Sequence, residues 1–183
     1  SGSLPPMEEG VGDRGNFLYP LPMNGSFQIF AQDEISSLRT AGKILRECLQ
    51  HVAKAVKAGV TTLELDAIAE KFILDRGGKP AFKGYHNYPA TLCTSVNEEC
   101  VHGIPSDRVL KEGDIVSLDC GVIVNSLYTD ACITVPVGKI PAETQKFLNA
   151  TSIALEDACA LVKPGAKIGD ISASIQESVE GAG

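Results

Sequence analysis

The sequence lacks the features that would direct it to a membrane or to a nucleic acid. No apolar run is long enough to span a bilayer, and the N-terminus has no basic stretch followed by an apolar one, as a secretion signal would. The Lys and Arg residues form no cluster, and the net charge of -7 opposes contact with a phosphate backbone. We therefore expect a soluble, cytoplasmic protein that binds neither DNA nor membrane.

The sequence also lacks the close cysteine pairs of a metal-binding or redox motif. Its six cysteines include no Cys-x-x-Cys pair, and several of them fall at apolar positions of expected helices or strands. Free, buried thiols in a reducing compartment are favoured over three disulfides. The 44% hydrophobic content is enough for one well-buried core, or for part of a larger one.

The chain divides into an N-terminal arm and an α+β region. Residues 1–30 are predicted to be a flexible arm, because they begin with Ser1-Gly2-Ser3, typical of an expression-tag remnant, and then lack hydrophobic periodicity. Residues 31–183 are predicted to form the domain. The expected elements are a helix over 33–57, a helix that opens with a Thr61/Glu64 capping box and ends at Gly77-Gly78, a strand over 88–101 interrupted at 97–99, a turn over 102–107, a hairpin over 114–135 and a helix over 141–162.

Two aspartates, Asp119 and Asp130, fall on the expected hairpin. If Asn125-Ser126 is its two-residue turn, Gly121 faces Asp130 and Asp119 lies one step along the same face. Diagonal neighbours lie roughly 7 to 8 Å apart at the backbone, so the two charges would repel unless one is protonated or a cation lies between them. A hard divalent metal suits such oxygen ligands.

The alternative for this pair is that one aspartate caps a turn and the other is solvated. Aspartate is disfavoured in strands, so two of them on one hairpin shift the balance toward function.

A second regularity is an internal repeat. Val56-Lys-Ala-Gly59 recurs as Val162-Lys-Pro-Gly165, 106 residues further along the chain, and each copy is followed by similarly spaced apolar residues. The first copy leads into strands, whereas the second reaches Gly183 at the point where its strands would begin. Chance similarity is the alternative; a duplicated α+β architecture with one strand layer outside this sequence is the favoured interpretation.

The segment from Phe82 to Pro105, which contains Tyr85-His-Asn-Tyr88-Pro and His102-Gly-Ile-Pro105, resembles type I methionine aminopeptidases when it is taken together with the aspartate hairpin. The similarity runs from about Asp33 to the end of the chain. It implies the pita-bread fold, in which two pseudo-symmetric α+β halves hold a two-metal site between them. This chain would contain the first half and the start of the second.

The resemblance implies a role for each site residue. Asp119 would chelate one divalent metal ion and Asp130 would bridge two, with Co, Mn, Fe or Zn as the metal, to activate water and polarise the scissile carbonyl. His102 would hydrogen-bond the substrate and stabilise charge in the transition state. Tyr85, Tyr88 and Cys93 would line the pocket for a methionine side chain, whose sulfur suits aromatic and thiol partners.

Core packing is the alternative for the pocket residues, above all for Cys93. The resemblance also implies that the backbone carbonyls of Asn97 and Glu99 hold a monovalent cation.

The sequence departs from the family pattern in its ligand set. The family completes the metal site with a histidine and two glutamates from the second half, and no residue of this sequence stands at those places. The other histidines, His51 and His86, are not placed to substitute. Two carboxylates alone hold a metal weakly, so we expect the chain by itself to be inactive and to need the remaining half, in cis or as a separate polypeptide.

The activity that the resemblance implies is removal of the initiator methionine from N-terminal methionyl peptides or nascent chains. One alternative is a non-catalytic pita-bread protein that binds peptide or a partner protein. A proline-specific or creatinase-like relative matches the Tyr85 to Pro89 segment less well.

Overall fold

The computed structural model describes residues 29–183, and its elements all belong to one unit, Gln32–Gly183. The predicted arm of residues 1–30 lies outside the described residues except for Ile29 and Phe30. In chain order the elements are α1 (Gln32–Ala55), α2 (Thr62–Asp75), β1 (Lys79–Pro80), the 3-10 turn η1 (Tyr85–Asn87), β2 (Leu92–Val96), β3 (Ile115–Val124), β4 (Leu127–Pro136), α3 (Ala142–Ala160) and α4 (Ile168–Ala182).

The first two helices form as predicted. The amide of Glu64 donates to Thr61 Oγ1 at 3.2 Å and the amide of Thr61 donates to Glu64 Oε2 at 2.7 Å, which completes the capping box of α2. The same helix ends just before Gly77, whose positive φ of 75° suits a residue without a side chain.

The sheet is antiparallel and is built around β3. β4 pairs along the whole of β3, whereas β1 and β2 pair with successive stretches of it. Val124 faces Leu127 across the turn and Gly121 faces Asp130, so the predicted hairpin register is confirmed. Asn125 and Ser126, both with positive φ, form the two-residue turn.

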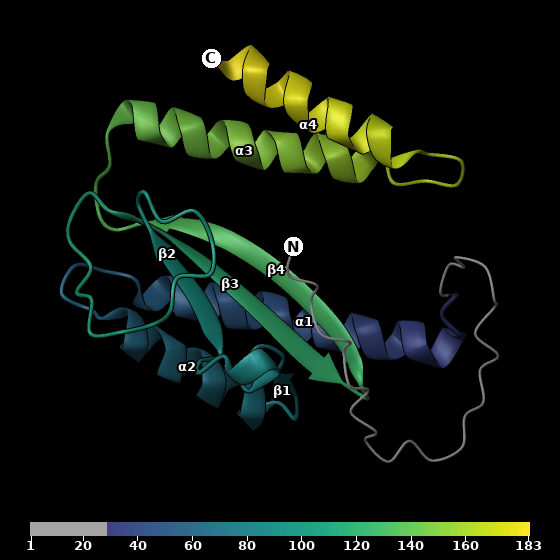
Figure 1. The fold of residues 1–183 in the computed structure, drawn as a ribbon, viewed down its shortest axis with the longest axis horizontal. Coiled ribbons are helices and arrows are strands. Elements are labelled where there is room, and N and C mark those ends of the chain that lie inside the picture. The colour runs from purple at the N-terminus through teal and green to yellow at the C-terminus, as the bar shows by residue number, and fades with distance from the viewer. Residues whose placement is uncertain (1–28) are drawn as a thin grey trace, which may run out of the picture. The chain divides into compact units, whose positions relative to one another are not determined.

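The two faces of the sheet have different surroundings. Alternate residues of β3 are fully buried against α1 and α2, which lie together on one side of the sheet in Figure 1. These buried residues are Val116, Leu118, Cys120 and Val122. The opposite face carries Asp119 and Asp130 and is free of this helix layer.

The predicted strand over 88–101 is wrong at both ends. Only Leu92–Val96 pairs with β3. The preceding residues follow η1 and include Pro89, which cannot donate to a strand ladder. After the strand, Asn97 turns the chain with a φ of 56°, so the residues beyond it leave the sheet.

The internal repeat is confirmed at the level of elements. α3 and α4 pack on one another and follow the order of α1 and α2, and α4 begins at Ile168, 106 residues after Thr62. Gly59 and Gly165 both have a φ near 90°, at 92° and 88°. At the start of α4 the carboxylate of Asp170 accepts the amide of Lys167 at 3.0 Å, as Glu64 does for Thr61.

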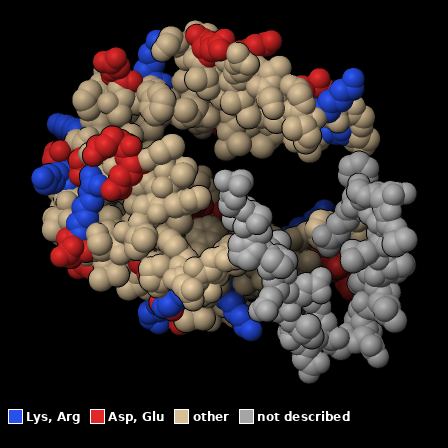
Figure 2. Space-filling view, viewed as in Figure 1, with Lys and Arg blue, Asp and Glu red and all other residues tan. Residues whose placement is uncertain are grey.

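The two copies differ in what covers them. Leu49 on α1 is 3% exposed, whereas Leu155, the matching residue of α3, is 61% exposed. Figure 2 shows the charged side chains of α3 and α4 along one side of the pair and an uncharged strip on the opposite side. Among the described residues, therefore, the second helix pair has an apolar face without a sheet beneath it. None of the helices described is long and apolar enough to cross a membrane.

Candidate active site

A pocket of about 550 Å³ opens on the face of the sheet that α1 and α2 leave free. It is lined by all six residues predicted to form the site: Tyr85, Tyr88, Cys93, His102, Asp119 and Asp130. Five further residues complete its wall: Phe82, His86, Asn87, Pro89 and Ile104. The structure thus brings together groups from η1, β2, β3, β4 and the loop at His102.

The two aspartates form the polar floor of this pocket. Asp130 pairs with Gly121, two residues along β3 from Asp119, so the two carboxylates are diagonal neighbours on one face of the hairpin. Burial, and then the nearby carboxyl group of Asp130, raise the pKa of Asp119 to about 6. Two neighbouring carboxylates fit a divalent cation, which would relieve their repulsion.

Cys93 and Cys132 flank Asp119 in the same row of the sheet. Cys93 pairs with Asp119 across β2 and β3, and Asp119 pairs with Cys132 across β3 and β4, so all three side chains share one face. Cys132 is exposed as a whole residue, but partial burial of its thiol, followed by the charges of Asp119 and Asp130, raises the pKa of that thiol to about 11. Cys132 was not predicted as a neighbour of the site, although hairpin register alone places it there.

All six cysteines are free, as predicted, but only half of them are buried. Cys48, Cys93 and Cys120 are buried, whereas Cys100, Cys132 and Cys159 are exposed. The expectation of buried thiols is therefore wrong for the second group.

His102 lies in a loop held tightly against β2. Its φ is 59°, and the next residue, Gly103, accepts a hydrogen bond from the amide of Thr94 at 2.7 Å and donates to Ser95 Oγ at 3.2 Å. A Cβ at Gly103 would overlap the carbonyl oxygen of Thr94. Glycine is required there because the loop backbone contacts the strand backbone, and this contact directs His102 to the pocket.

The aromatic wall is supported by the same loop. The hydroxyl of Tyr88 lies 2.9 Å from the carbonyl oxygen of Leu92 and 3.3 Å from that of Gly103, and its single proton is available to either. Burial and a hydrogen bond to Cys93 raise the pKa of Tyr88. Tyr85, 68% exposed, stands at the rim with the ring of His86 edge-on to it at 4.3 Å.

Phe82 reaches the pocket because β3 carries a glycine opposite Asp130. A Cβ at Gly121 would lie 2.7 Å from Ala81 Cβ and 2.8 Å from Phe82 Cε1. The missing side chain lets this aromatic residue approach the aspartate hairpin. Phe82 begins the segment that resembles the family, from Phe82 to Pro105, but no role was predicted for it.

The segment predicted to hold a monovalent cation has its side chains engaged elsewhere. Asn97 Nδ2 donates to Asp114 Oδ1 at 2.9 Å, and Glu99 forms an ion pair with Arg108 at 2.7 Å. Binding by the backbone carbonyls of Asn97 and Glu99 remains a prediction.

The remaining histidines differ in position. His51 lies on α1 and stacks on Phe72 at 4.9 Å, away from the pocket, whereas His86 lies at its rim. Within residues 29–183, no three His, Cys, Asp or Glu side chains are grouped closely enough to hold a metal ion. The described residues therefore supply two carboxylates toward a metal site and not a full coordination shell.

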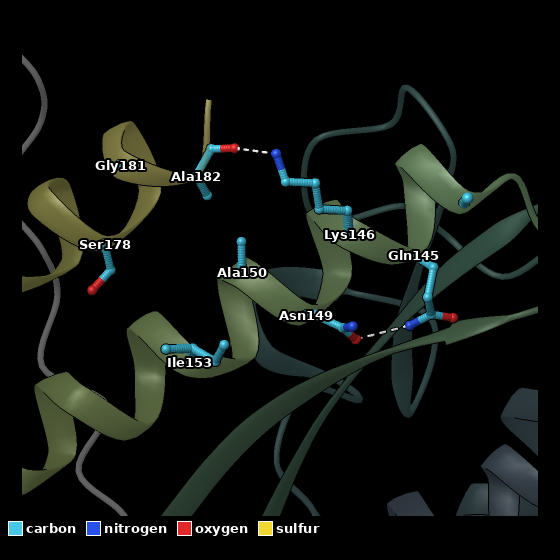
Figure 3. Close-up of a pocket in the computed structure, with 9 residues that line it drawn as sticks. Gln145, Lys146, Asn149, Ala150, Ile153, Ser178, Gly181 and Ala182 are labelled. Carbon is cyan, nitrogen blue, oxygen red and sulfur yellow. Dashed lines mark hydrogen bonds between the residues drawn. The ribbon is translucent and has the colours of Figure 1, made fainter.

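A second hollow, between α3 and α4, offers little chemistry. Figure 3 shows Lys146 reaching across to the carbonyl oxygen of Ala182, which it contacts at 2.8 Å, and Gln145 bonded to Asn149. Its other lining residues are small or apolar: Ala142, Ala150, Ile153, Ser178 and Gly181. With one lysine as its only titratable group, it is not a candidate catalytic site.

The fold and the carboxylate pair define a class of protein, a metallopeptidase of the pita-bread type. Residues 36–183 match the model of metallopeptidase family M24, and the chain belongs to that family. It is 48% identical to the methionine aminopeptidase of Clostridium acetobutylicum over 82% of its own length, and 45% identical to that of Aquifex aeolicus over 85%. The chain spans 60% and 63% of those relatives.

Solved structures agree with this assignment. The methionine aminopeptidase of Thermotoga maritima superposes with a TM-score of 0.84 at 39% identity, covering 86% of this chain and 64% of that one. The enzyme from Rickettsia prowazekii gives 0.83 at 35%, covering 85% and 63%. A prolidase from Pyrococcus furiosus, at 22% identity, a TM-score of 0.75 and coverage of 84% and 44%, shares the fold.

Proposed function

We propose that this chain forms the substrate-side half of a methionine aminopeptidase, which removes the initiator methionine from nascent chains in the cytoplasm. The observation that carries the proposal is the convergence of Asp119, Asp130 and His102 with an aromatic and thiol wall on one pocket. Similarity to relatives named methionine aminopeptidase supports it. No feature of the pocket favours a purely binding role, since a binding module has no need for two neighbouring carboxylates in one pocket.

The pocket suits a methionine side chain. Phe82, Tyr85 and Tyr88 present aromatic surface, and Cys93 adds a polarizable sulfur. His102 lies across the same pocket, where a neutral imidazole can hydrogen-bond the peptide group that follows the methionine.

Asp119 and Asp130 would hold the divalent metal of the family. When bound, it would supply a Lewis acid for the scissile carbonyl and lower the pKa of a bound water. The protein's own contribution is to hold both carboxylates on one rigid hairpin, so that a cation meets a preformed pair.

The chain would need further ligands for turnover. The apolar face of α3 and α4, exposed in residues 29–183, provides a surface on which a second sheet could dock as the first does on α1 and α2. The remaining half would be joined in cis or supplied as a separate polypeptide.

The test is release of methionine from a Met-Ala-Ser peptide in the presence of Mn²⁺ or Co²⁺. We expect no release by this chain alone and robust release by a form that includes the remaining family ligands. In that form Asp130→Asn should abolish turnover, because a neutral amide is a much weaker ligand than a carboxylate for a divalent cation, while Asp107→Asn, on an exposed loop, should not change it. Turnover by the chain alone would contradict the need for further ligands.

A further inference from the structure

We infer that Thr62 and Asp66 of α2 are positioning residues that together set the distance between the two walls of the pocket. Neither residue lines the pocket, and nothing in the sequence distinguished them from other residues of an amphipathic helix. The role of the pocket as a methionine site rests on the proposed function, whereas the geometry of its walls does not.

Asp66 holds the wall that carries Tyr88 and Cys93. It is 7% exposed, and its Oδ1 accepts the amides of Thr91 at 2.8 Å and Leu92 at 2.7 Å, where β2 begins. No lysine or arginine in the described residues is within ion-pair distance of it. Burying a carboxylate without a cation beside it costs desolvation free energy. The two charge-assisted hydrogen bonds to main-chain amides offset that cost, and they do so only while both amides point at the carboxylate.

Thr62 holds the other wall, which carries His102. It is 1% exposed, its hydroxyl donates to the carbonyl oxygen of Ser106 at 3.1 Å, and it accepts the amide of Ser106 at 2.9 Å. Next to it, the amide of Leu63 donates to the same carbonyl at 2.9 Å. The loop that follows His102 is thereby fixed to the first turn of α2.

The two residues act from one face of one helix. Positions 62 and 66 are one turn apart, so their side chains project in the same direction. The walls meet again at Tyr88, whose hydroxyl reaches the carbonyls of both Leu92 and Gly103. Each wall is therefore fixed to α2 at one residue, one at Thr62 and the other at Asp66. The distance between these two residues along the helix determines how far apart Tyr88 and His102 lie.

The test uses nuclear magnetic resonance of this chain with two variants that remove the anchors, two conservative variants and one control. Asp66→Ala and Thr62→Val remove the anchors, whereas Asp66→Asn and Thr62→Ser keep an acceptor oxygen in place. Val52→Ala, in the core of α1, is the control for lost stability alone. The probe is L-methionine, with the Tyr88 ring and the Gly103 amide as reporters of the pocket.

We expect Asp66→Ala to speed hydrogen exchange at Thr91 and Leu92 by about tenfold or more, since bonds to a charged acceptor are lost. The Tyr88 and Gly103 resonances should move, and the Kd for methionine should rise by a similar factor. Thr62→Val should do the same at Ser106. In Asp66→Asn and Thr62→Ser the exchange rates and the Kd for methionine should stay within about threefold of those of the unaltered chain.

The inference would be overturned if the anchor variants lost exchange protection evenly over the core, as Val52→Ala should, and left the Tyr88 and Gly103 resonances unmoved. If Asp66→Ala does not fold, Asp66→Glu makes the same comparison, because a longer side chain must displace the Thr91–Leu92 wall. Failure of the unaltered chain to bind methionine would count against the proposed function, while the exchange and resonance data would still decide the positioning role.

Discussion

At the scale of single residues, the decisive feature is a pair of carboxyl groups close enough for the charge of one to raise the pKa of the other. Burial is the largest cause of the raised pKa of Asp119, and the charge of Asp130 is the next. The charge of His102 acts in the opposite direction. In the metal-free protein Asp119 is therefore expected to keep its proton up to about pH 6, and we propose that a divalent cation takes its place when metal is present.

This pair predicts an unusual pH dependence of stability for the metal-free protein. The folded pKa of Asp119, about 6, lies above its ordinary value of 3.8, so between these values the folded state keeps a proton that the unfolded state has released. The contribution to the free energy of unfolding is present in full below about pH 4 and is lost as the pH rises through 6. Asp119→Asn should remove this fall.

The measurement is the urea midpoint from pH 4 to 7 in EDTA. Asp107→Asn, an exposed aspartate away from the pocket, should follow the unaltered protein. Parallel profiles for the unaltered protein and Asp119→Asn would show that Asp119 does not hold the proton.

At the scale of elements, the loop at His102 depends on the contact of Gly103 with β2. In Gly103→Ala the new Cβ would overlap the carbonyl oxygen of Thr94 and lie 2.8 Å from the carbonyl carbon of the same residue. We expect the loop to move off the strand, with a loss of about 1 to 3 kcal/mol in the free energy of unfolding and a shift of the His102 imidazole resonances. Calorimetry and resonance spectra check the two effects.

Gly42→Ala is the matched control, since no atom lies within 4 Å of the added Cβ in α1. It should stabilise the protein by up to about 1 kcal/mol through helix propensity. A Gly103→Ala protein as stable as the original, with His102 unmoved, would refute the close-contact explanation.

Most of the elements could be predicted from the sequence, because their signals are local. Alternation and the Asn125-Ser126 turn define the hairpin register, and the capping box defines the start of α2. The predicted interruption at 97–99 matches the end of β2 at Val96, but its start at Leu92 could not be predicted, because it depends on where pairing with β3 begins.

The site was predictable to the same degree. Asp119 and Asp130 came from the hairpin register and the other four residues from a family resemblance; all six line one pocket, and their roles remain predictions. Asp66 was not predictable, since its partners are main-chain amides more than twenty residues away.

At the scale of the whole molecule, the two helix pairs are related by the repeat but differ in burial. Leu49→Ala, at a position 3% exposed, should cost about 2 to 5 kcal/mol. Leu155→Ala, at the matching position 61% exposed, should cost less than about 0.5 kcal/mol in this chain. Chemical denaturation of both variants measures the difference.

The same pair of variants reports whether a partner covers the α3–α4 face. In a form that includes the remaining half, Leu155→Ala should become nearly as costly as Leu49→Ala, because a second sheet would bury it. Equal costs in this chain alone would mean that the face is already covered, for instance by self-association.

The central claim is that the Asp119–Asp130 pair is the metal site of an M24 enzyme. It is tested most directly by adding Mn²⁺ to the chain and mapping paramagnetic broadening of its amide resonances. We predict broadening centred on Asp119, Asp130, Cys93 and Cys132, sparing His51, and lost in Asp130→Asn. Broadening spread over surface carboxylates, or unchanged in Asp130→Asn, would contradict the claim.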